Sequence, residues 1–93
     1  PNAFSPNDDG INDIFTVFAD PRQVRQVKSF LVFNRWGETM FELYNFLPNN
    51  PSFGWNGRHR EQLMNAGVYV YYAELEFNDG EILLYKGDVT LIR

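Results

Sequence analysis

The part of the chain richest in oxygen ligands is an acidic loop near its start, with the sequence SPNDDGIND over residues 5–13. Calcium takes roughly six to eight hard oxygen ligands, which a loop can supply at alternating positions around a glycine. Asn7, Asp9 and Gly10 fall at the third, fifth and sixth positions of an EF-hand type loop. Asp13 falls at the ninth. The spacing therefore raises the hypothesis of a Ca²⁺ site with Asn7, Asp9 and Asp13 as ligands.

The same loop departs from the calcium pattern at both ends. Ser5 stands at the first position, and Thr16 stands where a bidentate glutamate closes the site and tightens binding. Asparagine and aspartate also favour turns, because their side chains bond to nearby backbone groups. Two interpretations stay open: a turn-rich loop that caps the domain, or a loop that binds a cation.

A second candidate is the sequence Phe33-Asn-Arg-Trp-Gly37. Asn34 and Gly37 suit a tight turn, and Arg35 can stack on an indole ring or bind a carboxylate through two N–H groups. An exposed Arg35-Trp36 pair is the kind of anchor that protein interfaces use. A tryptophan that covers the edge of the core would explain the same residues, so both interpretations stay open.

Trp55-Asn56-Gly57 has a similar composition. We interpret it as an aromatic plug followed by a turn that uses the positive φ open to asparagine and glycine. Exposed aromatic rings would also suit a glycan-binding surface.

Groups suited to catalysis are few. His59 is the only histidine, lies between Arg58 and Arg60, and has no neighbour in the sequence that would orient it as a base. Ser5, Ser29 and Ser52 have no evident partner base, and the chain has no cysteine for a disulfide or a thiolate metal site. We therefore expect no enzymatic activity.

Composition restricts the remaining classes. The 93 residues carry a net charge of −4 without a basic stripe, which argues against nucleic-acid binding. No apolar run is long enough to cross a bilayer, so we expect no direct membrane insertion. Acidic residues gather near the start and around residues 74–81, with basic residues at 22–35 between them. This arrangement indicates either an ordinary solvated surface or a polarised docking face.

Strands must position these groups, because the chain is 17% aromatic and its apolar residues alternate. Residues 67–77 show the clearest period of two, and Asn78-Asp79-Gly80 supplies a hairpin turn. We expect a helical turn only within 58–66, a loop at 45–57, and Gly87 as an interruption. The other expected strands are 14–19, 27–34, 39–43, 82–86 and 88–92. These elements predict an all-β fold, an Ig-like antiparallel β-sandwich of about seven strands without a disulfide.

Five blocks carry a family resemblance: PNAFSPNDDGIND, VFNRWGETMFE, GWNG, GVYVYYAELEF and KGDVTLIR. In this order, across residues 1–93, they resemble the gliding-motility-associated C-terminal domain, the type B sorting domain of the Bacteroidetes type IX secretion system. The resemblance implies one sorting domain over 1–93, at the C-terminus of a larger secreted protein such as a surface adhesin.

The resemblance also implies export through the periplasm and the outer membrane to the cell surface or the medium. The implied partners are the type IX translocon and an outer-membrane β-barrel of the PorP/SprF type. The alternative is an Ig-like spacer or adhesion module that binds calcium or glycan. The signature positions that we expect to form the recognition face are Asn7, Asp9, Gly10, Asn12, Asp13, Asn34, Arg35, Trp36, Gly37 and Arg93.

Overall fold

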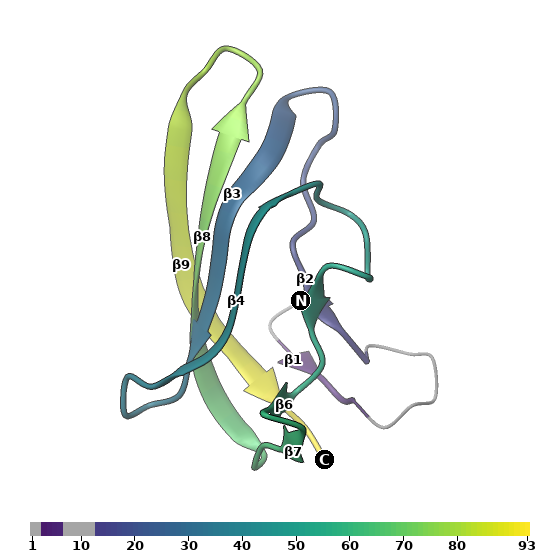
Figure 1. The fold of residues 1–93 in the computed structure, drawn as a ribbon, viewed down its shortest axis with the longest axis vertical. Helices are drawn as coiled ribbons and strands as arrows, with labels where there is room; N and C mark the ends of the chain where they lie inside the picture. Colours follow the sequence, from purple (N-terminus) through teal and green to yellow (C-terminus); the bar gives the residue numbers. More distant parts are fainter. Residues whose placement is uncertain (1–2, 7–12) are drawn as a thin grey trace.

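The computed structural model describes residues 3–6 and 13–93, and every regular element in them is a β-strand (Figure 1). A five-stranded sheet has the order β1-β9-β8-β3-β4, and the pair β2-β5 and the hairpin β6-β7 complete the fold. This confirms the all-β, sandwich-like fold, with one parallel pair, β1 and β9. The strands are β1 (Ala3–Phe4), β2 (Phe15–Thr16), β3 (Val24–Phe33), β4 (Thr39–Phe46), β5 (Gly54–Trp55), β6 (Arg58–His59), β7 (Gln62–Leu63), β8 (Gly67–Phe77) and β9 (Ile82–Leu91).

The inner face of the large sheet follows from the alternation in β8. Tyr69, Ala73 and Leu75 are buried, whereas Glu74 between them is exposed. The register carries this alternation to both neighbours, since Ala73 lies opposite Phe30 on β3 and opposite Tyr85 on β9. The predicted strand at 67–77 is therefore confirmed, with its apolar face turned inward.

Trp55 on β5 closes the core from the second layer. Its side chain is 0% exposed, and its ring lies 5.0 Å from that of Tyr69 and 5.4 Å from that of Phe4. The indole N–H donates to the backbone carbonyl of Arg58 at 2.8 Å, so the polar end of the buried ring is satisfied. The aromatic plug is confirmed, and Trp55 offers no glycan-binding surface.

Gly87 does not interrupt the last strand, as the sequence led us to expect. β9 runs through it, because the ring of Tyr71 packs onto Gly87 where a side chain would stand. A Cβ at this position would lie 3.0 Å from the Tyr71 hydroxyl oxygen. The glycine makes room for an aromatic ring and leaves the strand intact.

Two further expectations were wrong in detail. The segment 58–66 forms the hairpin β6-β7 in place of a helical turn, and both of its turn residues, Arg60 and Glu61, have positive φ (53° and 68°). Such a turn matches the twist of a two-residue hairpin. In the segment 14–19 only Phe15 and Thr16 form a strand, since β5 offers two partners there.

Truncation of Trp55 tests the core directly. We expect Trp55→Ala to lower the free energy of unfolding by about 3–5 kcal/mol, because it removes a fully buried ring and leaves a cavity. Chemical denaturation followed by circular dichroism measures the loss. A change below about 1 kcal/mol would contradict the closing role of this ring.

Tyr69 makes a pH-dependent contribution to the stability of the fold. Its hydroxyl donates to the backbone carbonyl of Asn65 at 2.7 Å. Burial raises the pKa of Tyr69, and the nearby charge of Arg93 partly opposes that rise. Because the pKa of Tyr69 is higher in the folded protein, the protonated phenol stabilises the fold. This stabilisation is fully present below the pKa of the unfolded chain, about 10, and is lost as the pH rises through the pKa of the folded protein.

We therefore expect Tyr69→Phe to be less stable than the wild type by about 1 kcal/mol at neutral pH. Above about pH 10 this difference should narrow, because only the wild type loses stability when the phenol ionises. Urea denaturation of both proteins at neutral and alkaline pH measures it. A gap that stays constant across this range would contradict the assignment.

Candidate recognition site

The hairpin turn between β3 and β4 is built around the side chain of Asn34. Its Oδ1 accepts hydrogen bonds from the backbone N–H groups of Trp36 and Glu38, both at 2.9 Å. Its Nδ2 donates to the Glu38 carboxylate at 2.8 Å. Gly37 closes the turn with φ 84°, a value that side chains rarely tolerate. Residues 34–37 are thus held in one conformation by local interactions, and we call them the 34–37 turn.

Trp36 points away from the protein at the tip of this turn. It is 76% exposed, and the guanidinium carbon of Arg35 lies 5.3 Å from the centre of its ring. At this distance the cation and the ring attract each other. The interpretation that Trp36 covers the edge of the core is wrong, because the ring is far too exposed for that role.

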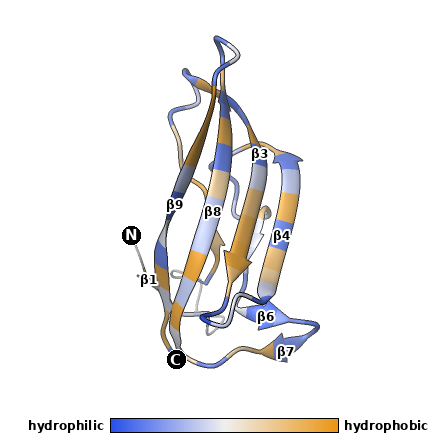
Figure 2. Cartoon of the chain, turned by 90° about the vertical axis from the view of Figure 1, so that its left-hand side faces the viewer, coloured by the Kyte–Doolittle hydropathy of each residue, from blue (hydrophilic) through white to orange (hydrophobic). Residues whose placement is uncertain are grey.

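The turn borders a hollow on the outer face of the large sheet, the face seen in Figure 2. The register places Leu31 beside Tyr72 and Phe33 beside Val70. We call this the outer hollow; its volume is about 620 Å³. The residues that line it are Ser29, Leu31, Phe33, Asn34, Arg35, Gly37, Val70, Tyr72, Glu74 and Leu84.

Polar groups border the outer hollow at the end away from the turn. Ser29 donates to Glu74 at 2.8 Å, and Gln26 donates to Glu76 at 2.7 Å. Arg25 also reaches the Glu76 carboxylate at 3.7 Å. Here the acidic residues of β8 are paired with one basic and two neutral polar residues of β3, as on an ordinary solvated surface.

The structure does not gather every expected recognition residue. Asp13 lines a different hollow, between the large sheet and the second layer. Arg93 donates to the backbone carbonyl of Met64 at 2.7 and 2.9 Å and thereby ties the end of the chain to the loop after β7. Four positions lie outside the described residues: Asn7, Asp9, Gly10 and Asn12.

The apolar lining of the outer hollow was missed by the sequence reasoning. Its signal was available in β8, where Val68, Val70 and Tyr72 alternate with the core residues Tyr69 and Tyr71. A run that is apolar on both faces is typical of a strand buried on both sides. Here the second face is open to solvent.

Neither a metal site nor a membrane span is found in the described part of the chain. Within residues 3–6 and 13–93, no three His, Asp or Glu side chains come together to hold a metal ion. The calcium hypothesis falls mainly on positions outside those ranges, so it stays a prediction. In the same ranges no helix is long and apolar enough to cross a membrane.

Comparison with known families gives the role of this fold. The model of the CHU_C type IX secretion signal domain matches the chain over residues 1–91. The chain belongs to this family. No curated protein matches it. A CHU_C domain is a secretion signal, so this one directs its cargo across the outer membrane by the type IX system, to the cell surface or the medium. The family favours this role over that of a spacer or adhesion module.

Proposed function

We propose that this CHU_C domain is recognised in its folded form, through the 34–37 turn and the outer hollow beside it. The observation that carries the proposal is the exposure of Trp36, whose ring is 76% accessible and stacked with Arg35. Hydrogen bonds that Asn34 Oδ1 accepts from the backbone hold the turn before any partner arrives, so little backbone conformational entropy is lost on binding. An exposed Arg-Trp pair on a backbone held in this way has the composition of an interface anchor.

Folding is required because the outer hollow is assembled from distant segments. Leu31 comes from β3, Tyr72 from β8 and Leu84 from β9. An unfolded chain would present these residues far apart. A partner that reads them together with Trp36 can therefore distinguish folded cargo from unfolded cargo.

The partner class follows from the family. A type IX secretion signal interacts with the type IX secretion machinery. Within that machinery we propose an outer-membrane barrel of the PorP/SprF type, which the type B resemblance supports. The site favours a partner surface with an apolar patch for Trp36 and a carboxylate for Arg35.

We propose further that residues 1–93 form one sorting domain of a larger cargo, such as a gliding adhesin, and have no catalytic role. His59, the one histidine, has its Nδ1 3.2 Å from the backbone carbonyl of Met40. That contact gives the ring a structural place next to β4.

Calcium binding by residues 7–13 remains a proposal with a direct test. If Asn7, Asp9 and Asp13 hold the ion, stability rises with calcium as RT ln(1 + [Ca²⁺]/Kd), or about 2.7 kcal/mol at a hundredfold excess over Kd. Thermal melting in millimolar calcium and in chelator measures the shift, with Asp9→Asn as the weakened site. Equal midpoints in both buffers would contradict the proposal.

The docking proposal is tested by export. The domain is fused behind an exported reporter in a bacterium that has the matching type IX system, and the reporter is measured outside the cells. We expect Trp36→Ala and Arg35→Ala to lower the exported fraction at least about tenfold, since truncation of an interface anchor costs about 2 kcal/mol or more in binding free energy. Both substitutions should change the free energy of unfolding by less than about 0.5 kcal/mol.

Leu47→Ala is the matched control. Leu47 is also an exposed apolar residue, 63% accessible, but it follows the far end of β4. Export should be unchanged in this variant. Normal export of Trp36→Ala and Arg35→Ala, or an equal loss in Leu47→Ala, would show that the 34–37 turn is not the recognised feature.

A further inference from the structure

The outer edge of β9 offers main-chain groups for another strand. The N–H of Phe77 donates to the carbonyl of Glu81 at 2.8 Å, and the antiparallel register with β8 is regular from there to Leu91. Hydrogen-bonded pairs therefore alternate along β9. The backbone N–H and C=O groups of the odd-numbered residues of β9 point toward β8. Those of the even-numbered residues from 82 to 88 point away from it.

β1 uses only the far end of this edge. It pairs in parallel with Thr90 and Leu91, and the N–H of Ile92 donates to the carbonyl of Phe4 at 2.9 Å. Among the described residues, no other segment pairs with the outer edge of β9. The pairing with β1 shows that the edge accepts a strand, and the vacant stretch from Ile82 to Asp88 spans about 20 Å.

Over its first four residues the vacant stretch is apolar on both faces. Ile82, Leu83, Leu84 and Tyr85 are 48%, 40%, 56% and 45% exposed, and the upper end of β9 is coloured as hydrophobic in Figure 2. Exposed edge strands are normally short, bulged or charged, which prevents unwanted pairing. Four consecutive exposed apolar residues on an edge are thus a feature that calls for a partner.

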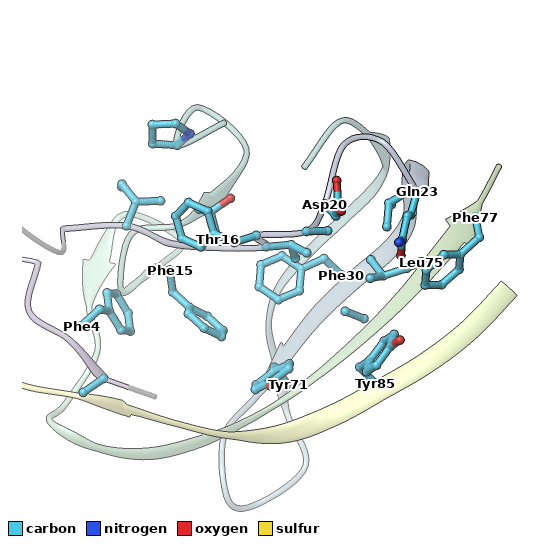
Figure 3. A pocket seen from close by; sticks show the side chains of 18 of the residues that line it. Phe4, Phe15, Thr16, Asp20, Gln23, Phe30, Tyr71, Leu75, Phe77 and Tyr85 are labelled. Carbon is cyan, nitrogen blue, oxygen red and sulfur yellow. The ribbon is translucent and has the colours of Figure 1, made fainter. Parts of the chain in front are cut away.

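A second hollow, the inner hollow, lies on the core side of this edge. Its volume is about 820 Å³, between the large sheet and the segment 13–20. Figure 3 shows Phe15 of β2 on one side of the space, opposite Tyr71, Tyr85 and Phe30 of the large sheet, with Leu75 further along that sheet. A strand added to β9 would direct every second side chain toward this space.

We propose that the β9 edge from Ile82 to Asp88 binds an extended strand of a partner polypeptide. The partner's backbone would pair with the outward N–H and C=O groups of β9, and its alternate apolar side chains would fill the inner hollow. Charge complementarity suggests which residues the partner strand carries between its apolar ones. Acidic residues outnumber basic ones along the edge and its turn, with Asp79, Glu81 and Asp88 against Lys86, so lysine or arginine fits there.

A second copy of this chain fits the edge less well. Each copy carries a net charge of −4, and pairing through β9 would bring the acidic residues of two copies together. The edge shares Leu84 with the outer hollow, but it binds through main-chain groups that lie outside the 34–37 turn, so the inference goes beyond the proposed function.

The test uses the 93-residue domain and blocked seven-residue peptides. The probes carry Val, Ile, Leu or Phe at alternate positions and Lys or Thr between them; in a control set, Ser replaces the apolar residues. We expect the alternating set to bind and to slow hydrogen exchange of the outward amides of Leu84 and Lys86. The serine set should bind at least about tenfold more weakly, because the inner hollow stays empty.

A proline at an outward position isolates the main-chain contribution. Lys86→Pro removes an N–H that points away from β8, which an edge strand tolerates. Lys86→Ala removes the same side chain and keeps the N–H. Peptide binding should weaken at least about tenfold in Lys86→Pro relative to Lys86→Ala. Peptides that are N-methylated at alternate backbone positions should lose binding to the wild-type domain, which decides the matter even if Lys86→Pro unfolds.

Three results would overturn the inference. The first is that no peptide of the alternating set binds, and the second is that N-methylated peptides bind as well as their parents. The third is that, without peptide, sedimentation shows a dimer and hydrogen exchange shows that the amides of Leu84 and Lys86 are already protected. The last result would assign the edge to a second copy.

Discussion

The pairing of β3 with β8 at the centre of the large sheet is the constraint on which the rest of the structure depends. It joins residues that are 37 to 53 positions apart in the chain, and it sets both faces of the sheet at once. On the inner face it places Phe30 beside Ala73, next to the ring cluster around Trp55. On the outer face it places Leu31 beside Tyr72, in the outer hollow. A shift by one residue would exchange these faces.

The small second layer explains why so much apolar surface remains open. Opposite five strands stand β2 and β5, each of two residues, together with irregular segments. Large rings such as Trp55 compensate, because each covers more of the sheet than an aliphatic side chain can. The cover does not reach the upper part of β9, where Leu83 and Tyr85 remain exposed beside the inner hollow.

The two open surfaces of the sheet suit a domain that must be recognised by a partner. Trp36 and the outer hollow lie on one face, and the edge of β9 lies at one side of the same sheet. Both exist only when β3, β8 and β9 are paired. Recognition of either surface would therefore report that the signal has folded, in a chain that has no cysteine to form a disulfide.

Much of this could be read from the sequence, because it depends on local interactions. The alternation in residues 67–77 determined the strand and its inner face, and Asn34 with Gly37 determined a tight turn through contacts within a few residues. The ordered blocks determined the family. Tertiary structure decided the rest, since exposure and cavities depend on what lies opposite. The sequence could not show that Trp36 stays open to solvent while Trp55 is buried, or that Gly87 makes room for a ring within a continuous strand.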